Sequence, residues 1–340
     1  SSTYNTAVGY YALRLNIVGG NTAVGGKALR ISTTGINNTA IGDQALYSNT
    51  TGNNNVALGH YALYKSSTSS YNTAVGTFAL RANTTGSYNT AVGFYALRAS
   101  TTVSSLTAIG YQALRSNSSG TNNTSVGYRS LYSNTSGSFN TSLGLSSLRS
   151  NVSGNKNTAV GYYALRANIA SLNTAVGTQA LRTNSSGSNN VAVGHYSLYS
   201  NTSGGNNTAL GTYALRSNSS GSFNVAIGAY ALQTITTVSN LTAVGYQALR
   251  INSSGTNNTA LGYQARFSNT TGGNNTALGN QALRSNINGS FNVAVGVYAL
   301  RTITSASFDT GVGYEALRFN SSGVNNAAVG YQALRNNTSG

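Results

Sequence analysis

The strongest constraint on this sequence is a short stretch that recurs at a fixed interval. Asn-Thr-Ala-Val-Gly occupies residues 5–9 and returns in about twenty variants along the chain. The glycine that closes it recurs every 17 residues, except for steps of 16 from Gly9 to Gly25 and from Gly161 to Gly177. A fixed period without spacers is typical of repeat proteins, in which each unit buries its apolar side against its neighbours. We therefore expect one continuous repeat domain over residues 1–340.

The composition narrows the class of protein. The chain has 40 glycines, no proline, cysteine, methionine or tryptophan, and 39% hydrophobic residues. It is too apolar and too regularly patterned for a disordered chain. Without cysteine it has no disulfides or thiolate metal sites. No apolar run reaches the ~18 residues of a membrane span, and the absence of a leader indicates a mature or partial chain.

Each unit reads as two short strands joined by glycine and polar turns. In residues 72–76, Thr73 and Val75 share one face of the first strand and Ala74 lies on the other. Residues 78–81 suggest a second strand. The valine and leucine columns are expected to meet in the interior, which would leave Ala74 and Ala79 as flat outer strips for another chain to approach.

This pattern predicts an all-β fold, a parallel β-solenoid of the β-roll or β-helix kind. It would have about 20 coils of 17 residues, each restarting one strand spacing, ~4.8 Å, along the axis. The handedness stays open. Neither chain end resembles a cap, so we expect head-to-tail stacking or truncation from a longer array.

A longer period is superimposed on the 17-residue period, because unusual turns recur in every fourth unit. They occupy residues 100–106, 168–172, 235–241 and 303–309, and define a four-coil superperiod of about 68 residues. Two explanations remain open. The block descends from duplication of a four-coil ancestor, or every fourth coil meets a neighbouring chain.

Two asparagine columns follow from stacking equivalent positions. The asparagine that opens the strand appears in seventeen of the twenty units, with Leu106, Leu241 and Asp309 as exceptions. We expect these amides to form a hydrogen-bonded ladder rather than a ligand site.

The second asparagine column, in the polar turn, forms Asn-x-Ser/Thr sequons. Such sequons on an exposed turn are glycosylation acceptors in a secreted protein. Alternatively, a turn simply favours these residue types. The candidates are Asn49, Asn83, Asn117, Asn134, Asn151, Asn184, Asn201, Asn218, Asn252, Asn269, Asn320 and Asn337.

The formal charge of +16 comes from 19 Lys and Arg against Asp43, Asp309 and Glu315. Most of these cations are arginines that follow the inward leucine, and we expect them to form an outward basic stripe. The stripe either keeps lateral faces apart or contacts anionic glycans, lipopolysaccharide or a neighbouring subunit's carboxylates. Specific nucleic-acid binding is disfavoured, because no recognition motif accompanies the charge. The stripe is represented by Arg81, Arg98, Arg115, Arg149, Arg166 and Arg182.

The sequence argues against an enzyme. His60 and His195 lie eight coils apart, and Asp309 and Glu315 have arginines nearby that favour structural ion pairs over acid–base chemistry. No residue cluster with metal-ligand spacing is present. We expect no catalytic residue, metal or cofactor.

The units at residues 38–52 and 258–265 resemble repeats of bacterial surface and phage tail-fibre proteins. The segment Asn-Val-Ala-Ile-Gly at residues 224–228 is similar to the head repeat of trimeric autotransporter adhesins. The resemblance covers the whole chain and implies a fibrous β-roll or β-solenoid at the cell surface or on a virion. No functional residue carries over, since the unit is longer than the adhesin repeat.

These observations predict an extracellular structural protein that forms a fibre or filament by self-association. One alternative is an adhesin or tail-fibre shaft that binds polysaccharide through its arginine and tyrosine columns. A third is ice binding through the recurring threonine. The threonine column is interrupted by valine, however, and is expected to face the core.

Overall fold

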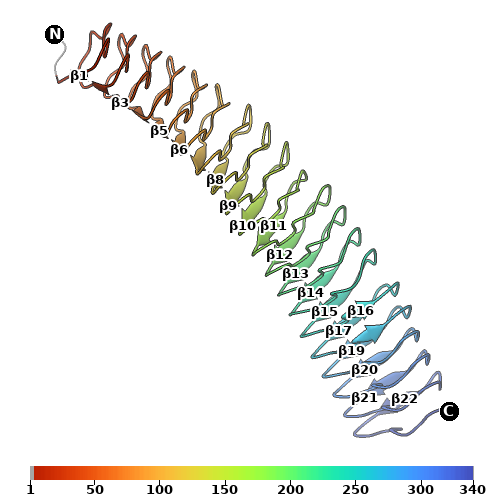
Figure 1. Cartoon of the computed structure of the whole chain (residues 1–340). Coiled ribbons are helices and arrows are strands. Elements are labelled where there is room, and N and C mark those ends of the chain that lie inside the picture. The colour runs from red at the N-terminus through yellow and green to blue at the C-terminus, as the bar shows by residue number, and fades with distance from the viewer. Residues whose placement is uncertain (1–3, 340) are drawn as a thin grey trace. The chain divides into compact units, whose positions relative to one another are not determined.

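The computed structural model of the chain describes residues 4–339, and these residues form a parallel β-solenoid. It is all-β, with no helix among the described residues (Figure 1). The chain divides into two compact units, residues 1–172 and 173–340. The boundary lies at the shortened turn, residues 168–172. That one continuous domain spans both units stays a prediction.

The strands of the first unit each cover the Thr-Ala-Val segment of one coil. They are β1 (Thr6–Val8), β2 (Thr22–Val24), β3 (Thr39–Ile41), β4 (Val56–Leu58), β5 (Thr73–Val75), β6 (Thr90–Val92), β7 (Thr107–Ile109), β8 (Thr124–Val126), β9 (Thr141–Leu143) and β10 (Thr158–Val160).

The second unit repeats this arrangement and adds two short strands. Its strands are β11 (Thr174–Val176), β12 (Val191–Val193), β13 (Thr208–Leu210), β14 (Val225–Ile227), β15 (Thr242–Val244), β16 (Ile251–Asn252), β17 (Thr259–Leu261), β18 (Ser268–Asn269), β19 (Thr276–Leu278), β20 (Val293–Val295), β21 (Thr310–Val312) and β22 (Ala327–Val329). The two additional strands, β16 and β18, pair with each other.

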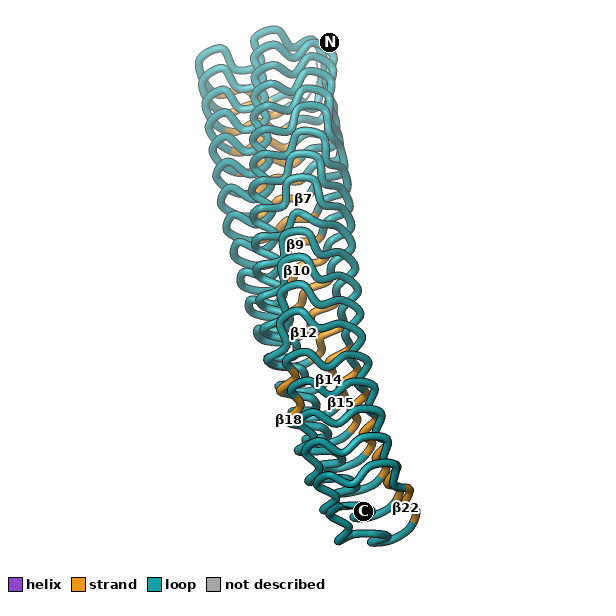
Figure 2. The backbone as a smooth tube through the Cα atoms, turned by 90° about the vertical axis from the view of Figure 1, so that its right-hand side faces the viewer, coloured by secondary structure: helices purple, strands orange, loops and turns teal. Residues whose placement is uncertain are grey.

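Within each unit, strands in successive coils pair in parallel and in register. In β4 and β5, for example, Val56 lies opposite Thr73 and Leu58 opposite Val75. Equivalent residues therefore stack into columns within each unit, and the strands of a unit, apart from β16 and β18, follow one another in a file (Figure 2).

The interior of each coil is narrow and takes small side chains from the strand. Ala74, Ala79 and Leu80 are fully buried, whereas Thr73 and Val75 are partly exposed on the outer face of the sheet. The predicted meeting of the valine and leucine columns is thus wrong, and so is the placement of the two alanine columns outside. The threonine column faces solvent, which corrects the expectation that it lies on the core side.

The segment after the anchor glycine is a turn with left-handed residues, so the predicted second strand at residues 78–81 is wrong. Phe78 and Leu80 have φ values of 60° and 50°. Its backbone still bonds between coils, because the Leu80 amide donates to the Ala96 carbonyl and the Phe78 amide donates to that of His60. Alternating left-handed residues turn Leu80 inward while leaving the coil flat enough to stack.

The opening asparagines form the expected ladder. Asn207 is fully buried, and its Nδ2 donates to Asn190 Oδ1 at 3.1 Å and to the Gly221 carbonyl at 2.9 Å. Its own Oδ1 accepts the Asn224 amide at 3.0 Å. The side chain of Asn207 therefore bonds to both the preceding and the following coil, and it also closes the turn of its own coil.

Three of the four unusual turns replace polar interior positions with apolar ones. Val103 and Leu106 fill the interior of one such coil, and Ile235, Val238 and Leu241 that of another. In the third turn, residues 303–309, the apolar side chains of Ile303 and Ala306 are buried beside Asp309. In these three coils apolar side chains therefore interrupt the asparagine columns, whereas the coil at residues 168–172 keeps the buried Asn168. Duplication and a regular neighbour contact stay predictions.

Candidate functional site

The arginine stripe lies on the surface, but each predicted member is half-buried rather than free in solvent. Where an aromatic residue precedes the arginine by three positions, the guanidinium packs on that ring. The Cζ atom of Arg98 lies 4.8 Å from the Tyr95 ring centroid, and that of Arg166 lies 4.9 Å from Tyr163. Such contacts contribute about 0.5–1 kcal/mol each at exposed sites and hold the guanidinium in one orientation.

Tyrosines interrupt the stripe and hydrogen-bond to it. Arg115 donates to the Tyr132 hydroxyl, and Arg182 donates to that of Tyr199. The stripe is therefore a set of short arginine runs bounded by tyrosines.

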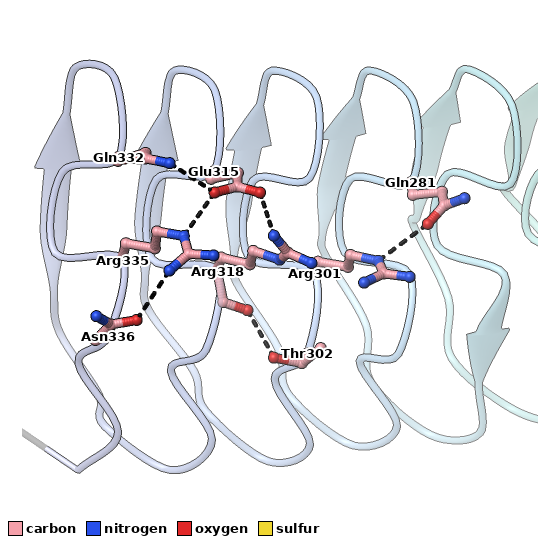
Figure 3. A network of polar contacts seen from close by, with 8 residues as sticks. All are labelled: Gln281, Arg301, Thr302, Glu315, Arg318, Gln332, Arg335 and Asn336. Carbon is pink, nitrogen blue, oxygen red and sulfur yellow. Dashed lines mark hydrogen bonds and ion pairs between the residues drawn. The ribbon is translucent and has the colours of Figure 1, made fainter.

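One part of the stripe is neutralised. Glu315, which is 4% exposed, occupies a position that most other coils give to glutamine or tyrosine. Its carboxylate accepts from Arg318, from Arg335 Nε at 2.5 Å and from Gln332 Nε2 at 3.0 Å (Figure 3). Burial raises the pKa of Glu315, but the hydrogen bonds from Arg335 and Gln332 and the nearby positive charges outweigh it and leave the pKa below its ordinary value. The expected structural ion pair is confirmed for Glu315.

Another part of the stripe, in the first unit, borders an open groove of about 420 Å³. Its lining contains four cations and no acidic residue. The lining residues are Lys65, Arg81, Ala82, Arg98, Ala99, Arg115 and Ser116.

The sequon asparagines lie inside the solenoid, so the expectation that they occupy an exposed turn is wrong for all but Asn337, which is partly exposed. Asn201 is typical: its Nδ2 donates to Asn184 Oδ1 at 2.8 Å and to the Gly204 carbonyl at 2.9 Å. The sequon asparagines thus form a second hydrogen-bonded ladder, along the polar turn. A glycan on Asn201 Nδ2 would break both of these hydrogen bonds. The buried sequon asparagines are Asn49, Asn83, Asn117, Asn134, Asn151, Asn184, Asn201, Asn218, Asn252, Asn269 and Asn320.

Asp309 belongs to the opening asparagine column and not to an ion pair. Its carboxylate accepts from Asn320 Nδ2 at 2.8 Å, from the Asn326 amide at 2.9 Å and from Asn326 Nδ2 at 3.2 Å. Burial raises the pKa of Asp309, although these hydrogen bonds partly oppose the shift. The expectation of an arginine partner for Asp309 is therefore wrong.

The buried cation Arg266 occupies the leucine column, in the coil where Ala-Arg-Phe replaces Ala-Leu-Arg. Its Nη2 donates to the Gly272 carbonyl at 2.7 Å, while Nε and Nη1 have no partner among the described residues. Burial lowers the pKa of Arg266 to about 9. The sequence shows that Arg266 replaces the leucine of this column, but the burial of the Arg266 guanidinium was not predicted.

Arg266→Leu is expected to raise the free energy of unfolding by about 2 kcal/mol at pH 7, because it removes an uncompensated buried charge. A base whose pKa is lowered by folding destabilises most below its folded value, so the gain should shrink as pH rises above about 9. Urea unfolding at pH 7 and pH 10 measures this, with the surface exchange Arg250→Leu as control. A loss of stability in Arg266→Leu would show that Arg266 is well solvated or paired.

The two histidines lie in different surroundings. His60 Nε2 lies 3.5 Å from Asp43 Oδ2, and His195 packs against the rings of Tyr196 and Tyr213. Over residues 4–339, no three His, Cys, Asp or Glu side chains gather as metal ligands. The same residues contain no helix of the length and apolarity needed to cross a membrane.

No protein-family model matches this chain, and a search of curated proteins finds no similar sequence.

Proposed function

We propose that this chain is a structural protein of an extracellular fibre or filament, in which solenoids associate side by side. The observation that supports this is the outer face of the parallel sheet. Each coil presents a threonine or valine, or in β22 an alanine, and then a valine, isoleucine or leucine, on that face. The aliphatic side chains are substantially exposed, for example Ile41 at 41% and Leu143 at 45%.

Two properties make this face suited to self-association. At ~4.8 Å per coil, the aliphatic column of one unit forms an apolar strip on the order of 45 Å long. Neither the threonine column nor the aliphatic column of the face contains a charged residue. Covering this face therefore buries no charge, because the arginine stripe belongs to another part of the coil. Long apolar strips on a rigid surface mark interaction sites in soluble proteins.

The test is to place lysines on this face. We expect the unaltered chain to form filaments or bundles by electron microscopy and to sediment as a growing species with concentration. Ile41→Lys, Ile109→Lys and Leu143→Lys together should keep it dispersed. The control, Thr51→Lys, Thr85→Lys and Ser119→Lys, adds equal charge on exposed turns and should still assemble. A dispersed wild-type monomer at high concentration would reject the proposal.

The outward threonine column supports a second candidate, ice binding. The hydroxyl and methyl groups of Thr73, Thr90 and Thr107 recur in register on one rigid face beside the aliphatic column. Ice crystals grown with the dispersed chain would become faceted if this face bound ice. Rounded crystals identical to those in buffer would dismiss this candidate.

A further inference from the structure

We propose that the groove formed by Lys65, Arg81, Arg98 and Arg115 binds a linear anionic polysaccharide, a sugar chain that carries carboxylate or sulfate groups. The groove lies in the first unit and does not use the outer sheet face, so this inference goes beyond fibre formation.

The groove follows the stacking direction. The Lys65 amide donates to the Arg81 carbonyl, the Ala82 amide to that of Arg98, and the Ala99 amide to that of Arg115. These bonds keep Arg81, Arg98 and Arg115 about one strand spacing, ~4.8 Å, apart. Lys65 lies one position further along its own coil, in the column of Ala82 and Ala99. Ala82 and Ala99 line the groove with small side chains. The result is an open channel with one positive charge per coil.

The cations of the groove are not neutralised by the protein. Lys65, Arg81 and Arg98 make no side-chain hydrogen bond or ion pair among the described residues, and Arg81 Nε is a buried donor without a partner. Arg115 bonds only the Tyr132 hydroxyl. The second unit offers a contrast: there the Glu315 carboxylate forms ion pairs with Arg318 and Arg335, which belong to the same arginine stripe (Figure 3).

The aromatic rings beside the groove pre-position the guanidinium groups. Arg81 lies over Phe78 at 5.4 Å and near Tyr61 at 5.6 Å, and Arg115 lies 5.6 Å from Tyr95. Because these side chains are already ordered, they lose less conformational entropy when they bind. Their planar, forked N–H groups match the oxygen pairs of carboxylates and sulfates.

The same arrangement favours a polysaccharide over a nucleic acid. Proteins that hold single strands stack the bases on exposed aromatic rings. In this groove the lining residues include no aromatic side chain, since the rings pack against the arginines. In B-DNA, moreover, each strand carries a charge every ~3.4 Å, which does not match a ladder of ~4.8 Å.

The test measures binding of a heparin-derived decasaccharide to the full chain by calorimetry, at concentrations where the chain is dispersed. We expect binding that weakens with salt. The triple variant that combines Arg81→Ala, Arg98→Ala and Arg115→Ala should lose affinity by about tenfold for each guanidinium removed. The control, Arg216→Ala, Arg250→Ala and Arg284→Ala, removes equal charge outside the groove and should bind like wild type. Circular dichroism checks that both variants stay folded.

Three results would overturn the proposal. Equal losses in both triple variants would mean that net charge alone drives binding. Equal affinity for a neutral cello-oligosaccharide would remove the role of the cations, and tighter binding of a thymidine 20-mer would assign the groove to nucleic acid. These binding measurements use the dispersed chain and do not depend on its assembly. If the chain forms no fibre, the polysaccharide proposal can still be tested.

Discussion

Gly194→Ala is expected to lower the free energy of unfolding by about 4 kcal/mol or more, the largest single effect in this fold. Gly194 has a φ of +129°, which side chains rarely adopt, and an added Cβ would lie 2.7 Å from the backbone carbonyl oxygen and carbon of Gly211 in the next coil. Strain in such a backbone region costs about 1–3 kcal/mol, and forced overpacking adds a similar amount.

The neighbouring coil cannot move aside to relieve the clash. The Gly194 amide donates to the Val176 carbonyl, and the Gly211 amide donates to that of Val193, both at 2.8 Å. Widening the gap would break bonds of this kind along the whole coil. The steric requirement explains why all twenty units keep glycine at the anchor position.

Gly205→Ala is the matched control, because it changes a glycine of the same coil that lies in the polar turn. Its φ is outside the left-handed region, and the nearest atom to an added Cβ is the Ser188 carbonyl oxygen at 3.1 Å. We expect a change within about 1 kcal/mol. Urea unfolding followed by circular dichroism compares the two variants, and equal effects would contradict the role assigned to the anchor.

The 17-residue period predicted the solenoid, the parallel register and the asparagine ladder, because each follows from repeating one unit. It did not decide which strand face points inward. Strand alternation separates Ala74 from Val75, and hydrophobicity alone favours burial of valine. The structure buries alanine, since a coil this short has room beside Leu80 only for small side chains.

A size restriction in the sequence could have shown the correct face. The Ala74 column contains only alanine, serine and glycine, as in Ser125 and Gly311, whereas the Val75 column accepts valine, isoleucine and leucine. Restriction to small residues indicates a tightly packed interior, and free exchange among aliphatic residues indicates an outer face.

The sequon asparagines were misplaced for a different physical reason. Asn, Ser, Thr and Gly together are typical of solvent-exposed turns. In this chain Asn201 caps the turn from inside, through its bond to the Gly204 carbonyl. A polar residue that recurs in stacked coils can satisfy its amide in a ladder, so polarity alone does not imply exposure.

Asn207→Ala is expected to lower the free energy of unfolding by about 3 kcal/mol. The change removes the acceptor of the Asn224 amide, whose hydrogen-bonding group is then buried without a partner. An unsatisfied buried donor costs about 1–3 kcal/mol, and the two donor bonds of the side chain are lost as well. Asn206→Ala is the adjacent control: its exposed side chain should cost only about 1 kcal/mol, from the left-handed φ of 58°. Equal losses in urea unfolding would show that the ladder contributes nothing.

Asp309→Asn tests the same ladder in the opposite direction, because it restores the amide that this coil lacks. A neutral amide can donate where a carboxylate only accepts, so we expect a gain of about 1 kcal/mol at pH 7. Burial raises the pKa of Asp309, and the ionised form is therefore the one that destabilises the fold. The cost is complete above the folded pKa and disappears as pH falls below the ordinary value of 3.8. The stability difference between Asp309→Asn and wild type should accordingly close as the solution is acidified, and a difference independent of pH would mean that the carboxylate is fully solvated by its asparagine neighbours.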